Sequence, residues 1–255
     1  GIVAISDGTH TITDAGIMRR VLEYASMFSI PVISHCVDET LALNGLMNEG
    51  YISTMMGLKG IPNAAEEMAI ARDIILAELT GCRLHIAHVS TAGGVALIRE
   101  AKKRGLPVTT EVMPYHCFLT DEAVRSYNPN MKLRPPLRTA ADVAAIREGL
   151  ADGTIDTIVS NHMPYSIDEK TVEFDAAPFG TIGLETTLGL VMTELVHTNI
   201  LNLNDAIRLM SVNPACIFGL DGGTLQVGAR ADITVFDPDR EWTVATKEFY
   251  SKSRN

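Results

Sequence analysis

The sequence has 255 residues, of which 46% are hydrophobic and 20% charged, a composition typical of globular domains. The net charge of −10, the pI near 5.1 and the lack of a basic cluster argue against a nucleic-acid surface. No apolar run approaches the roughly 18 residues that are needed to cross a bilayer. We therefore predict neither a nucleic-acid nor a membrane partner. At this length, one large α/β domain and two smaller domains are both possible.

The first half of the chain alternates between strand-like and helix-like segments. Segments 1–6 and 31–35 are short, apolar and rich in Val and Ile, and the helical pattern 14–28 lies between them. In that helix Ile17, Val21 and Leu22, with Tyr24 or Ala25, form an apolar stripe.

The alternation continues with predicted helix 64–81, closed by Gly81, and strand 83–90. Helix 93–105, strand 107–112, helix 139–153 and strand 154–160 follow, and Thr139 is the expected N-cap of the last helix. Repeated strand–helix–strand units indicate right-handed crossovers and a parallel sheet. From residue 184 the pattern is helical. Segment 223–238 has turn glycines around short apolar stretches, which predicts strands of an antiparallel appendage.

The cysteines and the chain ends bear on context. The four cysteines include no CxxC pair, so neither a thiolate zinc site nor a disulfide framework is indicated. Reduced thiols fit a cytoplasmic protein. The chain starts at Gly1, directly with an apolar strand, and ends in "SKSRN". We expect it to be a piece of a longer protein.

Histidines gather where the predicted strands end. His35, His88, His116 and His162 all occupy such positions, and the carboxyl ends of parallel strands meet at one edge of a sheet or barrel. Imidazoles from several strands that converge at one mouth are one way to build a catalytic zinc site. His85 and His88 are three residues apart, so we expect them to face opposite ways and only one to face a barrel interior.

Several long stretches carry a family resemblance. "GLKGIPNAAEEMAIARDI", "CRLHIAHVSTAGGVALIREAKKRGLPVT", "FDAAPFGTIGLET" and "GARADITVFDPDREWTV" resemble dihydroorotases, the cyclic-amide hydrolases of pyrimidine synthesis in the amidohydrolase superfamily. The resemblance implies a (β/α)8 TIM-type barrel with one or two zinc ions. Residues 1–220 would supply about strands 4 to 8 as a partial barrel, and residues 221–255 would begin the return to a small β-sandwich appendage.

The resemblance also assigns site residues. His35 and His88 match two histidine ligands of zinc, and Asp7 matches a carboxylate that bridges metals in some bacterial members. Because the second acid of that pair is Gly8 here, Asp7 has an equal alternative as a turn aspartate. Pro178, Phe179 and Gly180 match a loop whose backbone contacts substrate.

Three positions depart from the family pattern. Where the family reads "TDHAPH", this chain reads "SNHMPY", so Asn161 replaces the acid that binds metal and accepts the proton of the attacking water. Tyr165 replaces a substrate-contacting histidine, and Arg134 replaces a substrate-contacting asparagine. Loss of a general acid/base costs on the order of 10² to 10⁴ in rate.

The expected function follows from this mixture. The family reaction converts dihydroorotate and water to N-carbamoyl-aspartate, and we predict that this chain performs it weakly or not at all. One alternative is an active or redirected hydrolase of cyclic amides or imides, like allantoinase or dihydropyrimidinase. The other is a non-catalytic subunit that assembles with aspartate transcarbamoylase. A homo-oligomer is also expected.

Overall fold

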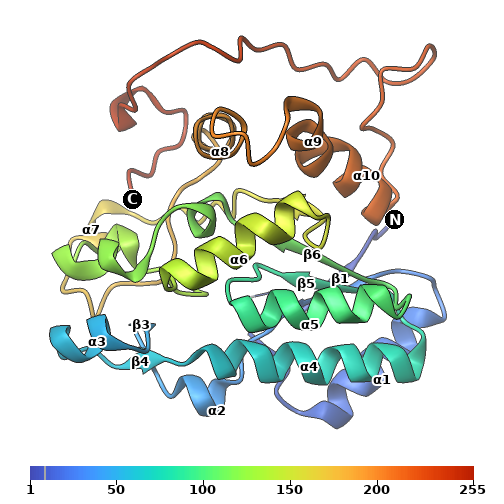
Figure 1. Ribbon diagram of the computed structural model, residues 1–255, viewed down its shortest axis with the longest axis horizontal. Helices are drawn as coiled ribbons and strands as arrows, with labels where there is room; N and C mark the ends of the chain where they lie inside the picture. The colour runs from blue at the N-terminus through green and yellow to red at the C-terminus, as the bar shows by residue number, and fades with distance from the viewer. Residues whose placement is uncertain (9) are drawn as a thin grey trace.

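The computed structural model describes residues 1–8 and 10–255 and contains one five-stranded parallel sheet (Figure 1). Its strand order is β1-β2-β5-β6-β7. The strands are β1 (Ile5–Ser6), β2 (Val32–His35), β5 (Leu84–Ala87), β6 (Val108–Val112) and β7 (Thr157–Ile158). All five lie inside the segments predicted as strands, and the parallel α/β sheet is confirmed.

Near its carboxyl edge the sheet has one polar face and one mainly apolar face. In register, His35 pairs with Ala87, and His85 pairs with Thr109. Side chains alternate along a strand, so His35, His85, Thr109 and Glu111 project from one face. The opposite face, with Ile86 and its neighbours, is completely buried against helices.

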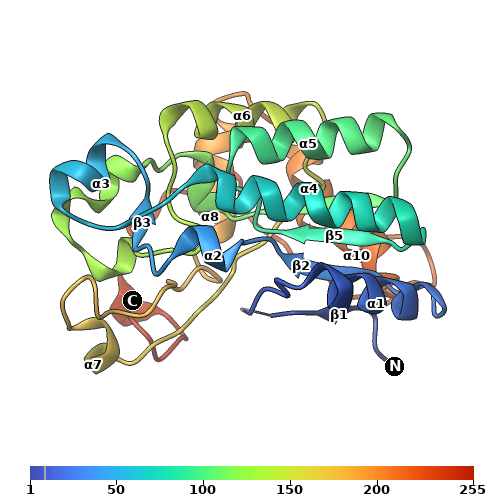
Figure 2. The same ribbon diagram turned by 90° about the horizontal axis from the view of Figure 1, so that it is seen from below.

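Four helices cover that apolar face in a row (Figures 1 and 2). They are α1 (Ala15–Ser26), α4 (Asn63–Thr80), α5 (Ala92–Lys103) and α6 (Ala140–Ala151). Gly81 ends α4 in a left-handed conformation with φ +66°, as predicted, and the Thr139 hydroxyl caps α6. The predicted stripe of α1 was partly wrong. Met18, Leu22 and Ala25 are buried, whereas Ile17 and Tyr24 are more than half exposed.

A smaller unit beside the sheet was not predicted. It contains α2 (Glu39–Ala42), the strand pair β3 (Met47–Asn48) and β4 (Gly60–Ile61), and α3 (Tyr51–Met56). Short 3-10 helices at Pro114–Cys117, Asp121–Ser126 and Pro129–Met131 and helix α7 (Ile167–Lys170) complete the loops. A separate apolar cluster around Met47, Ile52 and Leu137 holds this unit together.

The last part of the chain divides into a helical and an extended region. Helices α8 (Thr187–Val191), α9 (Leu203–Ile207) and α10 (Asn213–Phe218) are interleaved with π-helical turns at Met192–Val196 and Arg208–Val212, which confirms the helical prediction. After Phe218 the described chain forms only a 3-10 turn at Thr246–Glu248 and otherwise runs as coil across the top of Figure 1.

The strands predicted in segment 223–238 are therefore not formed in this structure. Leu225, Val227, Ile233 and Val235 are all more than 60% exposed. An extended segment becomes a strand only when a neighbour accepts and donates its backbone hydrogen bonds, and no such neighbour lies beside it in the described chain. Across residues 1–8 and 10–255, no helix is both long and apolar enough to cross a membrane.

Candidate metal and substrate site

The first two predicted ligands lie side by side at the carboxyl edge of the sheet. His35 is the last residue of β2, and His88 directly follows β5. Their ring centroids are 5.9 Å apart, and the ring planes cross at 65°. Adjacent parallel strands that end at the same level bring the two imidazoles together.

His88 is turned out of the strand alternation. Its φ of +55° is unusual for a residue with a side chain. His88 Nδ1 lies 2.8 Å from Glu111 Oε1, although the ring N–H is not aligned for a full hydrogen bond. This contact engages Nδ1 and leaves Nε2 as the nitrogen available to a metal.

Glu111 also contacts the other histidine of the motif. His85 Nε2 lies 3.1 Å from Glu111 Oε2, and His85 Nδ1 lies 2.8 Å from the Thr109 hydroxyl. The expectation that His85 and His88 face away from each other was wrong in effect, because the left-handed turn at His88 brings both rings to one carboxylate. Both His85 nitrogens are occupied, so His85 is no metal ligand in this arrangement.

Glu111 was missed by the sequence reasoning. It is buried, and although burial raises the pKa of its carboxyl group, the contacts with His85 and His88 hold that pKa at about 2. The available signal was a charged residue inside a buried strand, in "VTTEV", where an unpaired charge is too costly to keep.

His35 is only 7% exposed. Burial first, and then the nearby His88 and Arg134, lower the pKa of its imidazole to about 3. His35 is therefore neutral at physiological pH, which is the protonation state that binds a metal ion.

Asp7 contacts the same site through the backbone amide of His35. Its Oδ1 accepts a hydrogen bond from the His35 amide at 2.9 Å, and its buried Oδ2 has no hydrogen-bond partner. Burial raises the pKa of the Asp7 carboxyl group. The contact agrees with a positioning role at the end of β1, and the unpartnered oxygen leaves room for a cation ligand.

The donor chemistry fits zinc in part. Neutral imidazoles are typical zinc ligands, and a protein zinc site usually has four ligands in a tetrahedron. Across residues 1–8 and 10–255, no group of three or more His, Cys, Asp and Glu side chains is arranged to hold a metal ion. His35 and His88 thus supply two positions of such a site and not a complete one.

Asn161 lies at the same edge of the sheet, three residues beyond β7. Its φ is +39°, a second left-handed residue among the predicted site positions. Its side-chain amide donates to Met113 Sδ at 2.9 Å. Asn161 is thus tied to the end of β6 through an amide hydrogen, which a carboxylate at this position could not provide.

Arg134 and Phe179 come together near His35. The Arg134 guanidinium lies 5.6 Å from the Phe179 ring and 2.5 Å from Glu39 Oε2. Glu39 belongs to α2, which directly follows the loop after His35. Arg134 is therefore placed beside the candidate ligands, but its charge is already paired.

The other predicted substrate residues are held by two buried lysines. Lys170 Nζ donates to Pro178 O at 2.8 Å and lies 5.4 Å from the Tyr165 ring. Gly180 donates to Lys132 O, and its φ of +122° and the Met163 side chain leave no room for a Cβ atom. Burial lowers the pKa of the Lys170 ammonium group to about 8. Tyr165 and Pro178 are thus both held by the Lys170 ammonium group.

Two further strand-end histidines serve the backbone. Both Pro135 O and Pro136 O lie within 3.2 Å of His116 Nε2. His162 Nδ1 accepts from the Gly183 and Leu184 amides. Of the four histidines expected to converge, the structure brings together His35 and His88.

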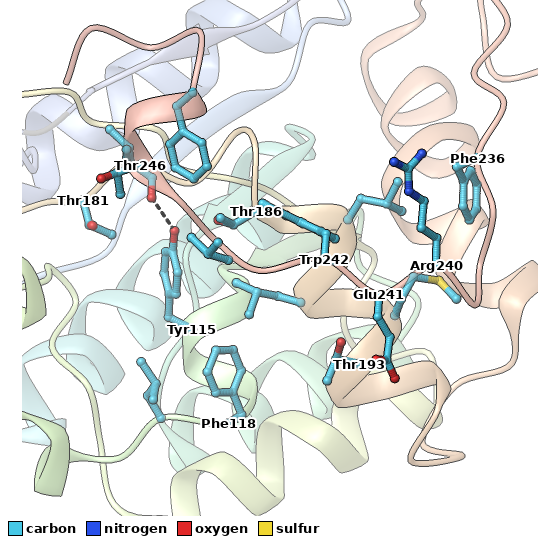
Figure 3. Close-up of a pocket in the computed structure, with 18 of the residues that line it drawn as sticks. Tyr115, Phe118, Thr181, Thr186, Thr193, Phe236, Arg240, Glu241, Trp242 and Thr246 are labelled. Carbon is cyan, nitrogen blue, oxygen red and sulfur yellow. Dashed lines mark hydrogen bonds between the residues drawn. The ribbon is translucent and has the colours of Figure 1, made fainter. Parts of the chain in front are cut away.

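A cleft of about 1550 Å³ opens elsewhere, between α8 and the extended C-terminal segment (Figure 3). Trp242 lies over it, and Tyr115 donates to Ile182 O at 2.7 Å on its wall, the dashed line in Figure 3. Its lining includes none of the predicted site residues. This cleft results from a coil crossing the helices, and it is not the site that the histidines define.

The chain is similar to known proteins along nearly its whole length. Residues 3–255 match the model of the amidohydrolase family. The chain belongs to the amidohydrolase family. Dihydroorotases of Pelotomaculum thermopropionicum and Caldanaerobacter subterraneus are 58% and 51% identical over all 255 residues. The chain spans about 60% of the length of these curated relatives.

Solved structures give the same fold. The L-hydantoinase (dihydropyrimidinase) of Arthrobacter aurescens matches 89% of this chain and 53% of its own, with 28% identity and a TM-score of 0.78. The D-hydantoinase of a Thermus species matches 96% of this chain and 56% of its own, with 25% identity and a TM-score of 0.80. The predicted resemblance to dihydroorotases within the amidohydrolase superfamily is thereby confirmed.

Proposed function

We propose that this chain carries part of the zinc site of a dihydroorotase-type amidohydrolase and that its hydrolytic power is impaired at Asn161. The observation that carries the proposal is the meeting of His35, which is neutral, with His88 at the sheet edge that also holds Asn161, the position where the resemblance expects an acid. The substrate class is a cyclic amide.

His35 and His88 would hold the metal through one ring nitrogen each. When bound, zinc lowers the pKa of a coordinated water and polarises a carbonyl group. The Glu111 contact at His88 Nδ1 would orient that ring and raise its basicity as a ligand.

Asn161 limits the remaining chemistry. Hydrolysis of a ring amide requires a group that takes the proton of the attacking water and delivers it to the leaving nitrogen. A carboxylate does this, whereas a carboxamide is not basic at neutral pH. The Asn161 amide is also engaged with Met113, so the side chain has a structural partner in place of a catalytic role.

Arg134 would set the preference for substrate charge. Its guanidinium lies beside His35, and a substrate carboxylate would have to compete with Glu39 for it. This arrangement is the observation that favours the second candidate, a hydrolase redirected to a cyclic imide without a carboxylate. The cytoplasmic location, the homo-oligomer and the aspartate transcarbamoylase partner stay predictions.

The test is an Asn161→Asp variant assayed for zinc content and for the interconversion of dihydroorotate and N-carbamoyl-aspartate. We expect the variant to be about 10²- to 10⁴-fold faster than the parent protein, because a general base is restored. Asn199→Asp is a matched control, since Asn199 also has a left-handed backbone and lies in a remote turn. Parent activity as high as that of the variant would contradict the impairment, and a hydantoin substrate preferred by both would support the redirected enzyme.

A further inference from the structure

We infer that helix α4 positions both candidate ligands through two buried carboxylates, with Asp73 acting on His35 and Glu66 acting on His88. The inference rests on the proposed function for its metal, and it identifies residues that touch neither metal nor substrate. Both acids belong to the one helix that packs behind the two histidine-bearing strands (Figure 2).

Asp73 holds the end of β2. Its side chain is completely buried, and its Oδ2 accepts from the Ser34 hydroxyl at 2.7 Å and from Cys36 Sγ at 3.6 Å. Ser34 and Cys36 are the two residues that flank His35. Because side chains alternate along a strand, both point toward the helix while His35 points to the polar face. Asp73 Oδ2 therefore holds the residues on both sides of His35.

The other Asp73 oxygen completes this anchor. Oδ1 forms an ion pair with Arg72 Nε at 2.8 Å, and Arg72 Nη1 donates to Thr13 O near the start of α1. The arginine compensates the buried charge, which would otherwise be costly.

Glu66 holds the turn after His88. Its Oε1 accepts from the Ser90 and Thr91 amides, both at 2.9 Å, and from the Thr91 hydroxyl at 3.0 Å. Its Oε2 accepts from the Ser90 hydroxyl and lies 3.7 Å from buried Arg138. The Glu66 carboxylate thus accepts four hydrogen bonds from the second and third residues after His88.

This anchor explains how His88 keeps its conformation. A left-handed backbone costs a residue with a side chain about 1 kcal/mol or more, so the surrounding structure must hold it. Fixing the amides of residues 90 and 91 fixes the direction in which the chain leaves His88. The ring is then aimed toward His35.

The spacing of the two acids matches the spacing of the two loops. Residues 66 and 73 are two helical turns apart, about 10 Å along one face of the helix. The 18-residue helix is a rigid rod, and β2 and β5 are directly paired neighbours. A single helix therefore fixes both imidazoles relative to each other. A zinc ion has fixed bond lengths, so its ligands must keep a constant separation.

Carboxylates suit this role better than amides. An ionised carboxylate only accepts, and Glu66 accepts four hydrogen bonds, three at Oε1 and one at Oε2. A Gln or Asn of the same shape removes the negative charge and replaces one acceptor oxygen by an NH2 donor, so the Ser90 or Ser34 hydroxyl would have to turn from donor to acceptor. Glu66→Gln and Asp73→Asn therefore alter the anchors while changing little volume.

The experiment measures the Zn²⁺ dissociation constant of the purified protein by competition with a chelating dye, together with urea unfolding of the metal-free protein. We expect Glu66→Gln and Asp73→Asn each to weaken Zn²⁺ binding by about 10- to 100-fold, as loss of outer-shell support commonly does. Amide hydrogen exchange at residues 34–36 and 88–91 should become faster in the same variants.

Asp156→Asn is the matched control. Asp156 is a partly buried acid that accepts from Lys102 Nζ at 2.6 Å and from the Thr110 amide at 2.8 Å, immediately before β7 and outside the loops that follow His35 and His88. It should lose stability without a change in Zn²⁺ affinity. Should an α4 variant fail to fold, Ser34→Ala and Ser90→Ala remove single donors and should weaken Zn²⁺ binding in the same direction by smaller factors.

The outcomes separate the two proposals. If His35→Gln and His88→Gln bind Zn²⁺ as tightly as the parent, the proposed function is wrong, and this inference is overturned with it. If those two variants lose Zn²⁺ while the α4 and serine variants keep parental affinity, only the positioning role of α4 is overturned. A loss in Asp156→Asn as large as that in the α4 variants would also overturn it, because the effect would then be general destabilisation.

Discussion

Strand β2 and the extended segment 223–238 were both predicted to form strands, and only β2 is a strand in the structure. Both contain Val and Ile beside polar residues. β2 lies between β1 and β5, and Val32 is almost fully buried. In the C-terminal segment Val227 and Val235 are exposed, and the described chain provides no neighbouring strand. Strand formation thus depends on an available edge as much as on residue type.

The largest expected effect separates the two regions by stability. Ile86→Ala removes a side chain with no exposed surface from the centre of β5, and it should lower the free energy of unfolding by about 2–5 kcal/mol. Ile233→Ala, in the exposed segment, should change it by less than about 0.5 kcal/mol. Urea unfolding followed by circular dichroism gives both values. Equal losses would mean that segment 223–238 is packed in solution.

The next effect depends on pH. Burial lowers the pKa of the His116 imidazole to about 4, whereas an unfolded histidine titrates near 6.5. The unfolded state binds the additional proton, so stability is lost as the pH falls from about 6.5 to about 4, by about 1.4 kcal/mol per pH unit. His116→Gln keeps a donor for the proline carbonyls and cannot titrate. Between about pH 4 and pH 6.5 the free energy of unfolding of this variant should depend less steeply on pH than that of the parent, by that slope. Parallel curves for variant and parent would refute the assignment.

A smaller effect concerns helix caps. Thr139→Ala removes the cap of α6, which packs in the helical layer, and should cost about 1 kcal/mol. Ser166→Ala removes an equivalent capping box from the four-residue α7. Because α7 is one turn long and three of its four residues are exposed, it should open locally, and the global unfolding free energy should hardly change. If thermal unfolding shows similar losses for both, α7 is a more integral part of the fold than its exposure suggests.

The smallest effect in energy is accessibility to protease. Arg230 and Arg240 lie exposed in the C-terminal coil, so limited trypsin treatment should cut there before any site within residues 15–218. Mass spectrometry of the early fragments identifies the cuts. First cleavage inside the helical layer would reverse the comparison between the two regions.

Local sequence signals predicted much of the secondary structure and the positions of two candidate ligands. The β-rich segments predicted the five strands of the sheet, Gly81 and Thr139 marked helix ends correctly, and the position of His35 and His88 after buried strands placed them at one edge. These features depend on residue type and short spacing, which a sequence displays directly. The family resemblance rests on longer stretches and is equally visible.

Tertiary structure decided what the spacing could not. Alternation placed His85 and His88 on opposite sides, but the left-handed turn at His88 brings both to Glu111. Asp73 and Glu66 read as ordinary helix residues until the fold sets them against Ser34 and Ser90. The unformed strands after residue 223 have the same cause. Contacts between residues distant in sequence depend on which surfaces meet, and the periodicity of one segment does not show which other segments pack against it.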